Sequence, residues 1–290
     1  MKRISITSLT CLLGSVLATS QAAAQSPTGL MEQKSATTGS TDVAKEGFET
    51  VAKPAETKEA TELKFSAGGL LATGNSRSMA LTGAGQLRLR RMANEYSANV
   101  AGNYGRAAPT PADDMQTSVE NLQGRIRYDR FLSEHWSLFV AQSARKDRFQ
   151  GLTLRLNFDP GVAYYVFDED KHRLWVEAGY DYQYDIRTTE ALRAAETPIE
   201  RTESRHSFRG FAGYENNINE VLRFNTGLEY LQSVQQSKNW RLNWDVGLTS
   251  AISNAFSFAT TFSLRYDNNP LTGVRKTDTV TALNLVYTLL

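Results

Sequence analysis

The residues of this sequence that could take part in chemistry are charged residues that occur at every second position. In Gln123, Arg125, Arg127 and Asp129, polar groups alternate with apolar or small residues, and the same pattern recurs along the chain after Glu62. Successive side chains of a β-strand point to opposite faces, so these charged groups would share one face. On that face they could pair with one another or line a path for ions.

The charged residues of this face are predicted to point into the interior of a closed sheet. The site residues predicted in this way are Arg88, Arg90, Arg125, Arg127, Asp129, Arg155, Glu177, Asp181, Arg209, Arg223, Glu229, Arg241, Asp245 and Arg265. With Lys64, Arg145, Asp159 and Asp185 the face has four more basic than acidic groups. Two interpretations follow: the charges pair and fill the interior, or they line a narrow, weakly anion-preferring pore.

Catalysis has little support among the nucleophiles and bases. His135 and His172 fall in predicted turns, whereas His206 begins a predicted strand beside Ser204 and Ser207. A lipid-modifying hydrolase of the outer membrane would need a nucleophile, a base and an orienting group, and no third group is evident. We therefore predict that the protein is not an enzyme, with the hydrolase as an alternative.

Metal and cofactor binding are also not expected. The single cysteine, Cys11, lies near the N-terminus, and the three histidines are far apart in the sequence, so no zinc ligand set is present. Asp113 and Asp114 could hold a divalent cation or bridge lipopolysaccharide, although paired acids in loops are usually only solvated.

The N-terminus has the features of a secretory signal. Lys2 and Arg3 precede an apolar stretch from Ile4 to Ala18, and small residues at 22–24 supply a cleavage site. Residues 1–24 are therefore predicted to be a signal peptide for export across the inner membrane. Its removal leaves 30 basic and 31 acidic residues, a balance that argues against nucleic acid as a partner.

Two regions of different composition follow the signal. Residues 25–61 are rich in Thr, Ala, Glu, Lys and Ser and contain one aromatic residue, Phe48, so they are predicted to be a flexible periplasmic linker. A short helix over residues 42–52 is compatible with this composition. From residue 62 to 290 the apolar residues follow a period of two.

The second region predicts an all-β antiparallel barrel of twelve transmembrane strands in the bacterial outer membrane. Each of the twelve alternating segments is about ten residues long, which suits a tilted strand that crosses a bilayer. Short connections are expected at 91–95, 131–135, 168–172, 216–220 and 253–256, with others that are often longer at 74–78, 105–117, 146–151, 186–203, 235–239 and 267–276. Short periplasmic turns and longer outer loops are typical of outer-membrane barrels. Pro160 lies inside the sixth segment and is predicted to mark a bulge or a strand end.

A soluble periplasmic β-sandwich that acts as a binding module is the competing architecture, because its strands also alternate. The aromatic residues favour the membrane barrel. Trp136 and Phe256 flank short turns, whereas Tyr104, Tyr230 and Trp240 flank longer connections. Two belts of amphipathic rings fit two membrane interfaces.

Several motifs resemble a known family. They are Tyr128–Ser133 followed by Trp136, Arg145–Gly151, Leu71–Ser76 and Gly161–Tyr165. These motifs are similar to those of the YdiY-like, salt-induced outer-membrane proteins, a family of unknown function, over about residues 62–290. The resemblance implies a barrel in the outer membrane and no established activity. Such barrels commonly end on an aromatic residue, whereas this chain ends on Leu290.

The expected partners follow from this location. They are outer-membrane lipids, lipopolysaccharide, the barrel-assembly machinery and, if the interior conducts, small solutes or ions.

Overall fold

The computed structural model describes residues 59–73, 77–108, 112–148, 151–169, 171–195, 198–253, 255–269 and 276–288. The predicted signal peptide, most of the predicted linker and the possible helix over 42–52 lie outside the described residues.

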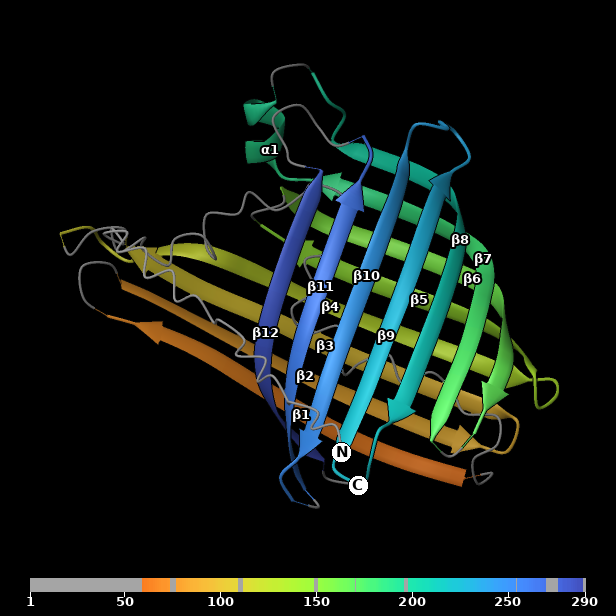
Figure 1. The fold of residues 1–290 in the computed structure, drawn as a ribbon. Helices are drawn as coiled ribbons and strands as arrows, with labels where there is room; N and C mark the ends of the chain where they lie inside the picture. Colours follow the sequence, from red (N-terminus) through yellow and green to blue (C-terminus); the bar gives the residue numbers. More distant parts are fainter. Residues whose placement is uncertain are drawn as a thin grey trace, which may run out of the picture.

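The described chain forms one sheet that closes on itself (Figure 1). Every strand is antiparallel to the next, and β1 pairs with β12 to close the barrel. The strands are β1 (Glu59–Ala72), β2 (Arg77–Arg91), β3 (Asn94–Ala108), β4 (Gln116–Phe131), β5 (Trp136–Asp147), β6 (Leu152–Asp168), β7 (His172–Arg187), β8 (Thr202–Asn217), β9 (Leu222–Ser233), β10 (Trp240–Ala251), β11 (Phe256–Asp267) and β12 (Thr277–Thr288). The predicted fold class, an antiparallel barrel of twelve strands, is confirmed.

The connections at one end of the barrel are often longer than those at the other, as the sequence predicts. Only Met92 and Ala93 separate β2 from β3, and Met92 has a positive φ of 54° in that turn. At the other end, the connection between β7 and β8 holds a short helix, α1 (Thr189–Ala194), which the sequence analysis did not predict. The Thr188 hydroxyl caps α1 by accepting a hydrogen bond from the Ala191 N–H at 3.2 Å. No described helix is long and apolar enough to cross a membrane.

Strand boundaries differ from those expected at several ends; β3, for example, extends at both ends into the predicted connections 91–95 and 105–117. β1 begins at Glu59, ahead of the predicted boundary at residue 62. The expectation for Pro160 is wrong, because β6 continues through this residue. The same register relates Phe158 to Tyr182 and Gly161 to Gly179, so no residue is inserted between them. Proline has no N–H to donate, and the ladder to β7 omits Asp159 and Pro160 without shifting.

The two faces of the sheet have opposite chemistry. Outward residues are apolar and exposed, with Leu71 at 76% and Phe208 at 64% of full exposure, whereas inward Arg88 is 2% exposed. Stacked ring pairs lie near both ends of the outer face, such as Trp136 with Tyr164 beside a short turn. The Trp240 ring stacks on Tyr266 beside the longer connections, with centroids 4.9 Å apart. A barrel with this outer face presents hydrocarbon-compatible side chains bounded by two aromatic belts.

An aromatic cluster lies on the inner face, which is mostly polar elsewhere. It consists of Phe131, Phe139, Ala163, Tyr165 and Trp175, with Ala93 and Phe211 packed against it. Its rings lie over glycines of neighbouring strands. Phe139 is paired with Gly161, and Trp175 with Gly213, and a Cβ on either glycine would overlap the ring. These glycines let large rings lie flat against the inside of the sheet.

Replacing Gly213 by alanine should therefore destabilise the barrel. The new methyl group would overlap three ring atoms of Trp175, and overpacking of this kind costs about 1–3 kcal/mol. The measurement is the urea concentration at which half of the barrel is unfolded. The folded fraction is read from gel electrophoresis, in which the folded barrel and the heat-unfolded chain differ in mobility. Gly210→Ala is the control on the same strand, because a Cβ there meets no atom within 4 Å. Equal midpoints for the two variants would contradict the proposed ring packing.

Candidate functional site in the barrel interior

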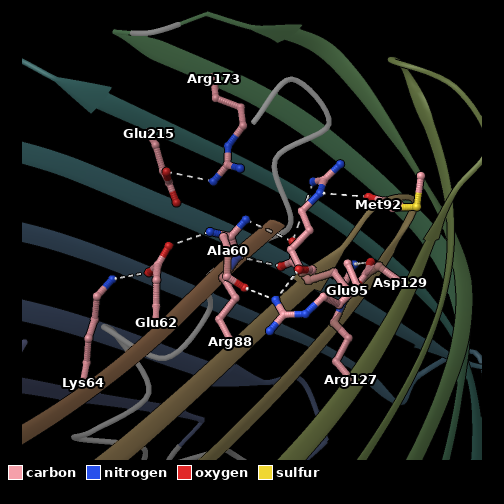
Figure 2. A network of polar contacts seen from close by, with 12 residues as sticks. Ala60, Glu62, Lys64, Arg88, Met92, Glu95, Arg127, Asp129, Arg173 and Glu215 are labelled. Carbon is pink, nitrogen blue, oxygen red and sulfur yellow. Dashed lines mark hydrogen bonds and ion pairs between the residues drawn. The ribbon is translucent and has the colours of Figure 1, made fainter. Parts of the chain in front are cut away.

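A chain of ion pairs runs across β1, β2 and β3 on the inner face (Figure 2). Lys64 Nζ lies 2.9 Å from Glu62, and the other Glu62 oxygen lies 2.6 Å from Arg88 Nη1. Arg88 also donates two hydrogen bonds to Glu95, from Nε at 2.9 Å and from Nη2 at 3.0 Å. This paired geometry gives strong, directional bonds, and both side chains are almost fully buried.

A second chain of ion pairs crosses the interior between strands that are not neighbours. Arg127 of β4 donates to Asp129 of its own strand and, at 2.8 Å, to Glu177 of β7. The other Glu177 oxygen accepts from Arg209 at 2.7 Å, and Arg209 donates to Glu229 at 2.6 Å. Since β5 and β6 separate β4 from β7, the Arg127–Glu177 bond has to pass through the interior. Figure 2 also shows the Arg127–Asp129 pair close to Glu95.

A third group of polar contacts lies nearer the longer connections. Arg155 of β6 makes a two-bond pair with Asp185 of β7, with both distances 2.7 Å. Gln183 donates to Asp185 at 3.0 Å and accepts from Arg241 of β10 at 2.9 Å. Arg241 Nη2 also lies 3.8 Å from Asp181. This group links β7 to β10 across two intervening strands.

Most of the residues predicted to face the interior do so. The buried ones are Arg88, Arg90, Asp129, Arg155, Glu177, Asp181, Arg209, Arg241 and Arg265. Arg125, Arg127, Glu229 and Asp245 are half-buried, and Asp245 pairs with Arg265 at 2.5 Å. Arg223 differs, because it is exposed at the start of β9, where it donates to Asn217 at 2.9 Å.

Sequence reasoning missed several charged groups of the inner face. Glu62, Glu95, Asp147, Glu203, Glu215 and Asp267 are acidic, and Arg173, Arg187 and Arg205 are basic. Among the described residues, leaving out the exposed Arg223 and adding six acidic and three basic groups removes the predicted excess of four positive charges. The same alternation could have found them, but most lie at strand ends that were assigned to turns.

The inward aromatic rings were also missed, and they bear on the same charges. The Arg90 guanidinium lies 4.0 Å from the Phe131 ring centroid, and that of Arg127 lies 4.1 Å from the Phe139 centroid. Arginine over an aromatic face gains a favourable cation–π interaction. The rings therefore help to position the guanidinium groups above the inner face of the sheet.

Opposite these charges, the inner face of β1, β2 and β3 is lined by small residues over much of its length. Ser66, Thr82, Ala84, Ser97 and Asn99 occupy inward positions and are half-buried, so some water-accessible surface remains beside them. Ala84 packs against the buried Ala101 of the next strand. The interior is thus asymmetric. Long charged side chains lie along β4–β10, whereas on β1–β3 they gather around Glu62, Arg88 and Glu95, and small side chains line much of the remaining length.

The histidines do not assemble a hydrolase site among the described residues. His206 Nδ1 is hydrogen-bonded to the Tyr180 hydroxyl, and its ring lies 5.1 Å from that of Tyr182 on the outer face. Ser207 is 2% exposed and faces inward, on the other side of the sheet from His206. His135 Nδ1 is bonded to the Tyr165 carbonyl at 2.9 Å, so it is also committed to structure.

The acidic loop residues show no ligand set either. The Asp113 carbonyl accepts a hydrogen bond from Arg77 at 2.6 Å, and the Asp113 side chain is exposed. Within the described ranges, no group of three or more His, Cys, Asp or Glu side chains could hold a metal ion.

A family model described as a protein of unknown function, DUF481, matches residues 65–289. The chain belongs to the DUF481 family. The match covers the barrel from β1 to the last residues of the chain, so the family and the fold coincide. A search of curated proteins found no match to the chain.

Solved structures similar to this DUF481 barrel include outer-membrane porins and channels. The NanC porin in a rhombohedral crystal form matches with a TM-score of 0.47 and 9% identity, over 80% of this chain and 100% of that one. An outer membrane channel from Pseudomonas putida F1 matches with a TM-score of 0.46 and 12% identity, over 80% and 98%. The KdgM porin in complex with disordered oligogalacturonate matches with a TM-score of 0.40 and 10% identity, over 80% and 100%.

Neutralising Glu177 should strongly destabilise the barrel. This carboxylate binds both Arg127 and Arg209, and removing one partner of a buried ion pair costs about 3–5 kcal/mol, since it leaves charge uncompensated. We expect Glu177→Gln to lower the urea midpoint of the folded barrel. Glu120→Gln is the matched control, because Glu120 pairs only loosely and at the surface, 3.9 Å from Lys146 and 3.6 Å from Arg148. An unchanged midpoint for Glu177→Gln would show that the interior bond is not formed.

Proposed function

We propose that this DUF481 protein is an integral outer-membrane barrel that forms a narrow, weakly selective pore. The observation that supports this most is the asymmetric interior. Long paired side chains crowd β4–β10, whereas β1–β3, away from the ion pairs of Arg88, have small inward residues with water-accessible surface. A twelve-strand barrel encloses more space than an eight-strand barrel, whose interior side chains just fill it.

The charge pairing sets the expected selectivity. Charges in a confined interior are costly unless they are paired and hydrogen-bonded, and the guanidinium groups of Arg88, Arg127 and Arg209 each bind two carboxylates. The inner charges of the described residues balance, so we expect only a weak preference for ions of either sign. A strongly anion-selective pore would need unpaired arginines along the path.

The proposed location follows from the outer face of the barrel. Exposed apolar residues between two aromatic belts suit a bilayer, and paired strands leave few backbone groups to face hydrocarbon. We further propose that residues 1–24 are a signal peptide and that residues before the barrel form a periplasmic linker. Lipopolysaccharide and the barrel-assembly machinery would then be partners, and the motif at Tyr128–Ser133 supports a place among the YdiY-like, salt-induced proteins.

Two other functions have less support. A soluble sandwich would have two packed sheets, whereas the described strands form one closed sheet with apolar residues outside. A lipid-modifying hydrolase would need a serine beside His206 as its nucleophile. Ser207 faces the opposite side, the Ser204 hydroxyl lies 3.4 Å from that of Tyr182, and Tyr180 is bonded to Nδ1 of the His206 ring. We therefore propose a transport or structural role without catalysis.

Fractionation should recover the full chain in the outer membrane, resistant to extraction with alkaline carbonate. The physical reason is the exposed apolar outer face, which would be costly in water. Recovery in the soluble periplasmic fraction would contradict the proposal.

Planar-bilayer recordings test the pore. The wild-type protein should give a small conductance and a reversal potential close to zero in a salt gradient. Ala84→Trp places a large side chain against the inner small-residue wall, so it should reduce the conductance by half or more. Ala98→Trp is the control, because Ala98 lies on the next strand between the outward Tyr96 and Val100.

No conductance from the wild type would favour a purely structural barrel. An equal reduction by both tryptophan variants would contradict the assignment of the conducting wall.

A further inference from the structure

The seam between the first and last strands is paired over only part of its length. β1 pairs with β12 from Lys64 to Ala67, opposite Leu285 to Thr288. In contrast, β1 pairs with β2 along its whole length, and β12 pairs with β11 from Thr277 to Tyr287. Figure 1 shows the two strands diverging from this short junction, with β12 rising and β1 running to the side.

Gly68 marks the end of close contact across the seam. The Thr82 hydroxyl of β2 lies 3.5 Å from Asn284 Oδ1 of β12, so side chains from the two neighbours of β1 meet here. A Cβ on Gly68 would lie 2.7 Å from the Thr82 hydroxyl and 2.9 Å from Asn284 Oδ1. Beyond this point, residues 69–72 of β1 and 277–283 of β12, all within the described ranges, have no ladder pairs with each other.

These unpaired edges lie on the side of the longer connections. Backbone N–H and C=O groups that face hydrocarbon without a partner cost several kcal/mol each, so an open sheet edge is not tolerated against lipid tails alone. The edge of β1 and the edge of β12 therefore need a polar occupant, such as water or a polar head group.

The side chains around the split have two kinds of chemistry. On the outer face, Leu71 is 76% exposed, Leu81 is 55% exposed and Leu283 is 58% exposed. On the inner face, the Thr82 hydroxyl donates to the Asn284 amide oxygen at 3.5 Å, a distance at the long limit for a hydrogen bond, so a head group could replace this contact. An apolar rim outside and neutral polar groups inside match a molecule with one apolar chain and a small polar head.

We propose that the split seam is a lateral opening through which a single-chain amphiphile passes between the outer leaflet and the barrel interior. The apolar chain lies against the leucines, and the head group binds Thr82, Asn284 and the free strand edges. This proposal rests on the membrane location proposed above. It does not require that the pore conducts ions.

Disulfide trapping tests the split itself. In a Cys11→Ser background, the full chain is expressed with Leu71→Cys and Thr281→Cys, two outward positions that would face each other if the register of the junction continued. A disulfide needs Cα atoms within about 7 Å, so a diverging seam should give no cross-link under mild oxidation. The control pair is Ala67→Cys with Leu285→Cys, which are register partners and should cross-link. Cross-linking of both pairs to the same extent would overturn the proposal.

Quenching of a fluorescent label tests the ligand. The barrel is reconstituted in vesicles with a bimane label on one cysteine, and a nitroxide-labelled stearic acid is added as the amphiphile. A label at Thr82→Cys, which faces inward at the split, should be quenched several-fold more than one at Asn99→Cys, which faces inward on β3. Equal quenching at these two positions would overturn the lateral opening.

A label at Leu81→Cys separates the two proposals. Leu81 faces outward, so a nitroxide in the bilayer should quench it whether or not the seam admits the amphiphile. Quenching at Leu81 without quenching at Thr82 would overturn only the opening. Absence of quenching at Leu81 would contradict the membrane location and the opening with it.

Discussion

Arginine side chains on the inner face can lie only inside the barrel, because the other face of every strand is apolar. This confinement forces each guanidinium to find a carboxylate or an aromatic ring within the same enclosed space. Glu177 lies between Arg127 and Arg209, and Arg127 also lies over Phe139. Buried ion pairs often add little net stability compared with apolar packing, but breaking one is costly. The pairs therefore specify which strands approach one another across the interior more than they stabilise the fold.

The fold could be predicted from sequence because its signals are local. A period of two and connections of alternating length are visible within a few residues, and both follow from strands that separate two solvents. The pairing inside the barrel could not be predicted in the same way. Arg127 and Glu177 are 50 residues apart and meet only because the sheet curves past β5 and β6. Similarly, Phe139 and Trp175 each stand between two apolar neighbours, so residue type alone could not assign them to the inner face.

The error in the predicted charge balance has a physical origin. The alternation that assigns a residue to the inner or the outer face is clear mainly in the middle of strands, where charged residues alternate with large apolar ones. Glu62, Glu95 and Asp267 lie near strand ends, and there the requirement for an apolar outer residue is weaker. Yet these carboxylates are the partners that neutralise the inner arginines, as the two bonds from Arg88 to Glu95 show. The interior of this barrel is nearly neutral because its basic and acidic side chains are paired. The carboxylate of a pair often lies near a strand end.

The position of the ion pairs also explains how the seam can remain short. Arg209 of β8 joins Glu177 of β7 to Glu229 of β9, and the bond from Arg241 to Gln183 joins β10 to β7. The bond from Arg127 to Glu177 joins β4 to β7. The curvature of β4–β10 is thus held by side chains as well as by the ladder. In contrast, the inner face near the seam has small residues such as Ser66 and Thr82, and the Thr82 hydroxyl is bonded to Asn284 of β12 only at 3.5 Å. Since one side of the barrel is held by bonds across the interior, closure does not depend on a fully paired seam.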